Sequence, residues 1–316
     1  MTLVKPLRAI AVLFAFSLTA CGETNSPVES ETGGLSLSGA RQATVDASAA
    51  VAYLDQVNAR LAARGANIRI AYAEYVTGDP EAHAAGQIVF ANDRELRFPS
   101  RWVPFDPVRE RDETLSYVVY QPLAVANGSI DAEPPIDAAL STWEDVTCSQ
   151  LDIVKVPDTG VFPSAVLGGD FSVADIIDLG FLPGTYFDTF LGDGASTTVL
   201  GVTFTAIWVD DDTGEPTDFD GNGHDDTALA EVWYNDDFAW STTEEDDTTD
   251  IETVAFHENG HALGLGHYGK VFGTFANLKL HVAPRAAMNA FIFGTLRGPL
   301  GTDNAAYCGL YGSWPS

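Results

Sequence analysis

The segment from His257 to His267 constrains this chain more than any other, because it sets three histidines and a glutamate at fixed spacing. On a helix, His257 and His261 lie one turn apart, so both imidazoles project from one side and can share a metal ion. Glu258 lies beside that side, near enough to contact a metal-bound water without binding the metal. Gly264 can adopt positive φ and end the helix, and the turned chain then brings His267 round as a third ligand. Three neutral imidazoles leave a fourth zinc position open, as hydrolysis requires.

We predict that this segment is a buried helix, because its apolar residues point in several directions. These residues are Val254, Ala255, Phe256, Ala262 and Leu263. Thr249 to Glu252 resembles a capping box that begins the helix. The full histidine pattern arises by chance in a chain of this composition at a rate on the order of one in 10^5. The alternative is a helix with packed or solvent-facing histidines, and it must explain why half of the six histidines fall in this segment.

The chain is strongly acidic. Its 45 acidic residues outnumber the 16 basic ones and give a formal net charge of -29. Such a surface repels phosphate backbones and anionic headgroups, so we expect no nucleic-acid partner. It suits bound cations.

The first residues are typical of an export signal. Lys5 and Arg8 supply a positive start, and the apolar stretch that follows is too short to span a bilayer. It ends in a Leu-Thr-Ala-Cys sequence that resembles the bacterial lipobox, in which Cys21 is acylated and becomes the mature N-terminus. We therefore predict a signal peptide over residues 1–20, a lipidated tether over 21–45, and an exported protein anchored to a bacterial membrane, facing the periplasm or the cell exterior. The alternative is plain secretion with an incidental cysteine.

Two further cysteines remain once Cys21 carries lipid. Cys148 and Cys308 are an even number in an oxidising compartment, and a disulfide between them would close a long loop. The alternative is two free buried thiols.

Hydrophobic periodicity divides the chain into two predicted domains. Residues 46–105 contain a helical pattern ended by Gly65 and a strand-like alternation, so we expect a small α+β domain of unknown role there. Residues 115–316 alternate strands and helices, which favours an α/β or α+β body with mixed pairing. Its predicted strands are Tyr117–Tyr120, Ile153–Val156, Val202–Val209 and Ala230–Tyr234, and its predicted helices are Ile136–Trp143 and a short one at Ala174–Leu179.

The histidine segment and a downstream turn together resemble the metzincin metalloproteases. Their signature, HExxHxxGxxH, is followed by a methionine-bearing turn, and Arg285 to Ala290 around Met288 matches that turn. The best resemblance is to the matrixin-like branch in a bacterial form, and it covers roughly residues 115–316. Further segments that carry it are Trp233–Asn235, Trp240–Ser241, Asp250–Val254, Leu300–Asp303 and Leu310–Gly312.

The resemblance implies a fold, a cofactor and an activity. The fold would be an α+β zincin domain with a twisted, mainly parallel five-stranded sheet, a central active-site helix and a small C-terminal subdomain. Met288 would support the metal site from beneath without being a ligand. The activity would be that of a zinc endopeptidase, in which a zinc-activated water attacks the scissile peptide and Glu258 acts as general base and then acid. A protein or peptide substrate would lie along an edge strand, for which we propose Ala230–Tyr234, and Phe291 and Phe293 would line the specificity pocket.

Some departures from the family narrow this prediction. No tyrosine follows Met288 two positions on, so a tyrosine zinc ligand is not indicated. Asn304 stands where matrixins often have a second aspartate. No PRCGxPD-like segment exists, so thiol-to-zinc latency cannot operate in that form. The sequence does not reveal the oligomeric state, and a monomer is the default expectation. Two other functions stay open: a non-catalytic adhesion or binding lipoprotein with structural zinc, and a hydrolase of non-peptide substrates.

An acidic loop predicts a second cation site. Oxygen-bearing side chains crowd around two glycines, a composition that suits calcium. The candidate ligands are Asp218, Asp220, Asn222, Asp225 and Asp226. The glutamate expected at the twelfth position is missing, and a solvated acidic turn is the alternative. His224 could instead bind a structural zinc, which we rank below calcium.

Overall fold

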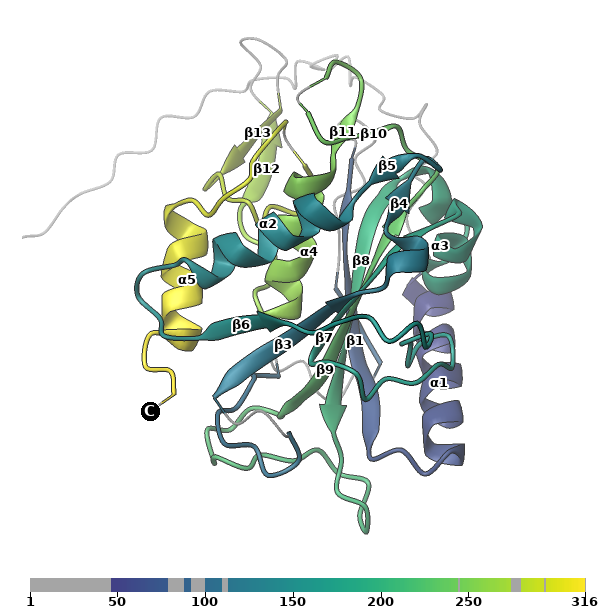
Figure 1. Ribbon diagram of the computed structural model, residues 1–316, viewed down its shortest axis with the longest axis vertical. Helices are drawn as coiled ribbons and strands as arrows, with labels where there is room; N and C mark the ends of the chain where they lie inside the picture. The colour runs from purple at the N-terminus through teal and green to yellow at the C-terminus, as the bar shows by residue number, and fades with distance from the viewer. Residues whose placement is uncertain are drawn as a thin grey trace, which may run out of the picture. The chain divides into compact units, whose positions relative to one another are not determined.

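The computed structural model describes residues 47–78, 88–91, 100–109, 113–243, 245–273, 280–292 and 294–315 (Figure 1). The chain divides into two compact units, residues 1–40 and 41–316, and everything described below belongs to the second. The predicted signal peptide, the tether and Cys21 lie outside the described residues. Within the described part of the chain, no helix has the length and apolarity needed to cross a membrane.

A seven-stranded sheet organises the molecule. Its strands in spatial order are β2 (Ile88–Phe90), β1 (Ile68–Thr77), β8 (Val199–Trp208), β9 (Thr227–Asn235), β7 (Ile176–Leu182), β3 (Thr114–Val119) and β6 (Asp152–Lys155). Strands β9, β7, β3 and β6 are parallel, whereas β8 is antiparallel to β9. The expected mainly parallel five-stranded sheet is therefore present as β6 to β8. Two antiparallel strands, β1 and β2, extend it beyond β8.

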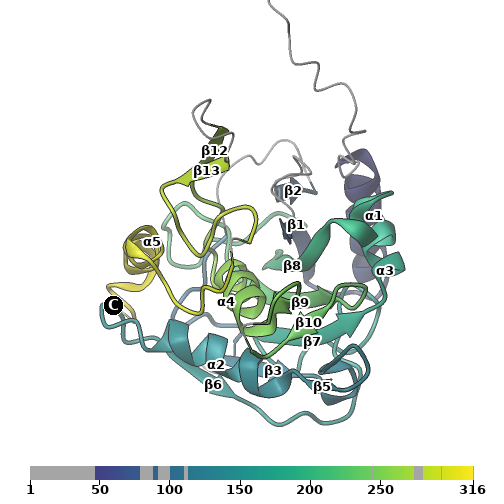
Figure 2. The same cartoon turned by 90° about the horizontal axis from the view of Figure 1, so that it is seen from above.

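Helices cover both faces of this sheet (Figures 1 and 2). On one face lie α2 (Glu133–Glu144), α4 (Ile251–Ala262) and α5 (Gly301–Tyr311), and on the other lie α1 (Ala47–Ala63) and α3 (Gly184–Leu191). Two hydrophobic clusters, one on each face, fill the space between sheet and helices. Strands β7 and β9 are buried at every residue, because helices cover both faces of the sheet at these central strands.

Short elements complete the chain. They are the 3-10 turns η1 (Gln121–Leu123) and η2 (Ala195–Thr197), and the paired strands β4 (Val125–Ala126) with β5 (Ile130–Asp131), β10 (Trp240–Ser241) with β11 (Thr249–Asp250), and β12 (Lys270–Gly273) with β13 (Leu280–Ala283).

The N-terminal segment does not form a sheet of its own. We expected residues 46–105 to be a separate domain, yet β1 pairs with β8 from Ile68 to Thr77. Helix α1 packs against α3 and the sheet through Leu54, Val57 and Leu61. The expectation failed because alternation along a strand predicts a buried face but not the partner strand.

Two further expectations are corrected. The helix predicted over Ala174–Leu179 is wrong, because Ile176–Leu182 is strand β7 and the helix α3 begins only after Pro183. A short apolar run does not by itself separate a buried strand from a helix. Ala230–Tyr234 is a strand as expected, but it lies in β9 between β8 and β7 and is not an edge strand.

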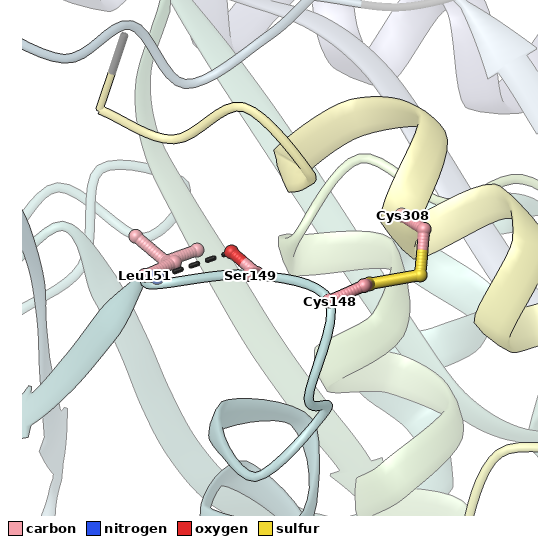
Figure 3. The surroundings of a disulfide bond; sticks show 4 residues. All are labelled: Cys148, Ser149, Leu151 and Cys308. Atoms are coloured by element: carbon pink, nitrogen blue, oxygen red, sulfur yellow. Dashed lines mark hydrogen bonds between the residues drawn. A yellow bond between two sulfur atoms is a disulfide. The ribbon is translucent and has the colours of Figure 1, made fainter.

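A disulfide joins Cys148 to Cys308, as predicted (Figure 3). It links the loop after α2 to α5 across 160 residues of sequence. The alternative of two free thiols is wrong.

Candidate metal centre

Helix α4 is held firmly at both ends. The Asp250 carboxylate caps its first turn by accepting from the Thr253 backbone N–H at 2.8 Å. The helix therefore begins within the predicted segment, but one residue later than the capping box implies, because Asp250 and not Thr249 is the capping residue. At the other end, the Trp102 indole donates to the Ala262 carbonyl at 2.8 Å, and the Tyr311 hydroxyl donates to the Leu263 carbonyl at 2.6 Å. These bonds satisfy carbonyl groups that a helix end leaves without partners.

The three predicted histidines converge on one point. His257 and His261 lie in α4, and Gly264, at φ +79°, turns the chain so that His267 faces them. The Nε2 atoms of His257 and His261 are 3.0 Å apart, and Nε2 of His267 lies 3.2 Å from the first and 3.1 Å from the second. Zinc–nitrogen bonds of about 2.0–2.1 Å in tetrahedral geometry place ligand nitrogens roughly 3.3 Å apart. The spacing therefore fits a shared zinc ion.

Backbone carbonyls fix the tautomer of two of these rings. Nδ1 of His257 lies 2.8 Å from the Ala287 carbonyl, and Nδ1 of His261 lies 2.7 Å from the Leu265 carbonyl. A carbonyl only accepts, so each Nδ1 carries the proton and each Nε2 presents its lone pair to the common point. Converging lone pairs repel one another unless a cation lies between them. The donor set thus fits zinc.

Burial and mutual proximity act on the ionisation of the rings. Desolvation holds the pKa of His257 and of His267 well below the usual range, and the neighbouring histidines lower both further. Burial also lowers the pKa of His261, but Glu74, 3.2 Å from its Nδ1, raises it together with Glu258 and the Leu265 carbonyl, and the net shift is upward. Neutral imidazole is the form that binds metals.

Glu258 is fully buried beneath strand β8. Its Oε2 accepts from the Thr203 hydroxyl at 2.7 Å, while Oε1 has no hydrogen-bond partner among the described residues. Burial raises the pKa of Glu258 to about 7, against the lowering effects of His261, the Thr203 hydroxyl and the nearby Val76 N–H. A buried carboxylate oxygen without a partner implies a missing polar group beside the histidines.

Gly201 lets strand β8 pass directly over Glu258. A Cβ at this position would lie 2.8 Å from both Cγ and Oε1 of Glu258. Only glycine leaves room for the carboxylate here.

The turn around Met288 lies against the other side of α4. Met288 is fully buried, and a Cβ on Gly260 would lie 2.4 Å from its sulfur. Asp303, in the first turn of α5, accepts from the backbone N–H groups of Ala287 and Met288 at 2.8 and 3.1 Å. Asp303 therefore anchors the turn whose Ala287 carbonyl orients His257.

The acidic loop brings together three of the five predicted calcium ligands. Carboxylate oxygens of Asp218, Asp220 and Asp226 lie within 4.8 Å of one another, and the fourth predicted aspartate, Asp225, does not belong to this group. The Asn222 side chain bonds within the loop, to Asp220 and to the backbone of His224.

Asp226 is the buried member of this group. It is fully buried, its Oδ2 accepts from the Phe219 N–H at 2.9 Å, and its Oδ1 has no partner in the described part of the chain. Burial raises its pKa to about 6.

Sequence reasoning missed the residues that surround the metal ligands. Thr203, Gly201 and Glu74 lie on strands. Asp303 belongs to the segment Leu300–Asp303 that carries the family resemblance, but its contact with the Met288 turn was not predicted. One signal was readable: a glycine within the apolar run Val199–Val202 indicates close approach of another group. The other contacts depend on tertiary pairing.

A buried helix that presents two histidines and a glutamate to one point, with a third histidine after a glycine turn, defines a zinc metalloprotease. The matrixin family model matches residues 111–272, just over half of the chain, so this chain belongs to the matrixin family. No curated protein matches it. The matched part includes the three histidines and strands β3 to β9, and it begins after β1.

Proposed function

We propose that this protein is a zinc endopeptidase in which His257, His261 and His267 hold the metal and Glu258 moves the proton. The observation that carries this proposal is the convergence of three Nε2 atoms within 3.2 Å, beside a buried carboxylate oxygen of Glu258 that lacks a partner among the described residues. Membership of the matrixin family supports the same chemistry.

Each side chain has a defined task in this mechanism. Zinc held by the three imidazoles would supply Lewis acidity toward the attacking water and the scissile carbonyl. The Glu258 carboxylate accepts the proton of the water through Oε1 and later delivers it to the leaving amine. The Thr203 hydroxyl holds Oε2, which leaves Oε1 as the carboxylate oxygen without a hydrogen-bond partner among the described residues.

The test replaces Glu258 by Gln, which keeps the shape and removes the proton acceptor. We expect one zinc per chain by atomic absorption, as in the wild type, and a loss of labelled-casein hydrolysis of about 10^2- to 10^4-fold. Glu252→Gln, on the same helix and outside the site, is the matched control and should hydrolyse casein at the wild-type rate. Equal activity of Glu258→Gln and the control would overturn the mechanism.

The rival function is a non-catalytic binding lipoprotein with structural zinc. A structural site is usually closed by four protein ligands, whereas three donors converge among the residues that the structure describes. Removing zinc with 1,10-phenanthroline discriminates between the two. An enzyme loses casein hydrolysis and regains it when zinc returns, while a binding protein shows no hydrolysis with or without zinc.

We also propose that Cys21 carries the lipid anchor, as its lipobox-like context suggests. Metabolic labelling with radioactive palmitate in a bacterial host should label the wild type. Cys21→Ser should remove the label and release the protein from the membrane fraction. Label retained in Cys21→Ser would refute the anchor.

The acidic loop is proposed to bind calcium through Asp218, Asp220 and Asp226. Hard carboxylate oxygens on a glycine-containing loop suit this ion, and the partnerless Oδ1 of Asp226 is the oxygen best placed for it. The ion would stabilise the loop between β8 and β9.

A further inference from the structure

If only the part of the chain that matches the family is considered, β8 is the edge strand of the sheet. Residues 111–272 contain the strands β6, β3, β7, β9 and β8, in which only β9 pairs with β8. The outer edge of β8 would then present unpaired backbone groups, to which an extended peptide can add as another strand. In the full chain this edge of β8 is already paired with another strand. Strand β1, from outside the matched part, lies along it.

The register between β1 and β8 places the last residues of β1 next to the part of β8 that contacts Glu258. Gly201 and Thr203, which contact Glu258 from above, pair with Val76 and Glu74 of β1. The carboxylate of Glu74 reaches to within 3.2 Å of Nδ1 of His261. Val76 is fully buried and belongs to the same apolar cluster as Met288. The segment therefore contacts the proposed machinery directly.

The end of β1 is bonded on both sides, as a peptide in a cleft would be. On one side, the Gly78 N–H donates to the Thr198 carbonyl at 3.3 Å. On the other side, Thr77 forms a parallel bridge with Phe291, and the Ile292 N–H donates to the Thr77 carbonyl at 3.0 Å. Phe291 and Ile292 belong to the chain that follows the Met288 turn. Residues 76–78 thus lie between β8 and the wall of the predicted specificity pocket.

The cleft continues past the point where β1 ends. A cavity of about 450 Å³ begins at Gly78, Leu200 and Ile292 and is lined further on by the loop at residues 245–250. The cavity is therefore continuous with the end of β1 at Gly78. With β1 in place, His257, His261 and Glu258 are each 0% exposed.

We propose that residues Glu74–Gly78 occupy the substrate cleft as an internal pseudosubstrate, so the full chain is latent until this segment leaves. The inference rests on the proposed protease function and adds its regulation. It supplies a steric form of latency in a chain that lacks the cysteine motif PRCGxPD. If the cleft is closed in about 99% of molecules, activity is about 1% of that of the open form, and weakening the segment raises it in proportion.

Val76→Asp tests the proposal by putting a charge into the apolar end of the cleft. We expect labelled-casein hydrolysis to rise at least about ten-fold over the full-length wild type. Val89→Asp is the matched control: Val89 is a buried valine of β2 that pairs with Ala73 and packs on the α1 face, away from the cleft. Equal activation by Val76→Asp and Val89→Asp would mean that any destabilisation of the N-terminal strands raises activity, and it would overturn the proposal. Should Val76→Asp fail to fold by circular dichroism, the isosteric Val76→Thr replaces it, and the same rise is required.

A second measurement does not depend on activity. Cobalt-substituted protein is titrated with N-acetyl-leucyl-leucine hydroxamate while the visible absorption is recorded. We expect binding to Val76→Asp and at least about ten-fold weaker binding to the wild type. A heptapeptide with the sequence of residues 72–78 should compete with the hydroxamate in Val76→Asp, and the same peptide with Asp in the place of Val76 should not. Equal hydroxamate binding by wild type and variant would refute the occupied cleft.

The outcomes distinguish a failure of the pseudosubstrate proposal from a failure of the proposed protease function. If Val76→Asp binds the hydroxamate more tightly than the wild type but does not hydrolyse casein, the proposal that β1 occupies the cleft is supported and the proposed protease function is wrong. Suppose instead that wild type and Val76→Asp hydrolyse casein at the same rate, and that the double variant Val76→Asp/Glu258→Gln does not hydrolyse it. The proposed protease function is then supported and the pseudosubstrate proposal is wrong.

Discussion

Asp178 is a fully buried carboxylate on strand β7. Its Oδ2 accepts from the Tyr234 hydroxyl at 2.6 Å and from the Asn259 amide at 3.5 Å, while Oδ1 has no partner in the described chain. Burial raises the pKa of Asp178 to about 7, although both hydrogen bonds lower it. The folded state therefore binds a proton that the unfolded state releases near pH 4.

This residue should make the protein less stable as pH rises. Between about pH 4 and pH 7 the folded state binds more protons at Asp178 than the unfolded state, so its contribution to the free energy of unfolding falls across that window, by up to about 4 kcal/mol. Asp178→Asn removes that dependence. Urea unfolding at pH 5, 6, 7 and 8 should show the variant gaining stability relative to the wild type as pH rises. Parallel curves for the two proteins would contradict the shifted pKa.

Asp226 should decide whether the acidic loop binds calcium. We expect 1 mM calcium to raise the melting temperature of the wild type by several degrees, since saturation about 100-fold above Kd contributes roughly 2.7 kcal/mol. Asp226→Asn should lose most of that rise. Asp212→Asn, an exposed acidic position in the same loop and outside the cluster, should keep it. The same calcium effect in Asp226→Asn and the wild type would exclude the site.

Strand β8 and helix α4 depend on one glycine for their close approach. In Gly201→Ala the new methyl group meets Glu258 Cγ and Oε1 at 2.8 Å, so the carboxylate must turn away. Small misplacements of a catalytic group cost up to about 10^2-fold, and we expect casein hydrolysis to fall by about that factor with zinc content unchanged. The control is Gly298→Ala, whose methyl would meet only Thr142 Cγ2, at 3.8 Å. Equal loss in both variants would mean that the effect is not local to Glu258.

Some elements were predictable because their signals are local. The helix α4 carries its cap, its histidine spacing and its terminating glycine in one continuous segment, and all three are present. The run Ile176–Leu182 carries no such signals, and its length and apolarity suit either a strand or a buried helix. The run is a strand because it pairs with β3 on one side and β9 on the other, which the local sequence does not reveal.

The candidate site divides in the same way. The three histidines lie within one segment, so their convergence could be read from spacing. The Thr203 hydroxyl, the Glu74 carboxylate and the Asp303 cap come from elements more than 30 residues away. Their arrival depends on strand register and helix packing, which a single sequence leaves open.

At the scale of the whole molecule, the N-terminal segment is built into both faces of the structure. Helix α1 packs on the α3 face, while the end of β1 enters the apolar cluster beneath α4. Within Glu74–Gly78, Val76 belongs to the cluster beneath α4, whereas Tyr75 belongs to the cluster that contains α1. Releasing this segment therefore withdraws a buried side chain from each cluster, which is why the folding of Val76→Asp is checked by circular dichroism.

The disulfide should stabilise the whole unit, since it links residues 160 positions apart (Figure 3). Loop-closure entropy sets an upper estimate of about 5 kcal/mol for a bridge of this span, and measured losses are typically about 2–5 kcal/mol. Cys148→Ser and Cys308→Ser should each lower the urea midpoint by a similar amount, because either change breaks the same bond. The double variant should lose no more than either single one, which is the signature of a shared interaction. Additive losses in the double variant would show that the two residues stabilise the fold separately, through packing and not through the bond.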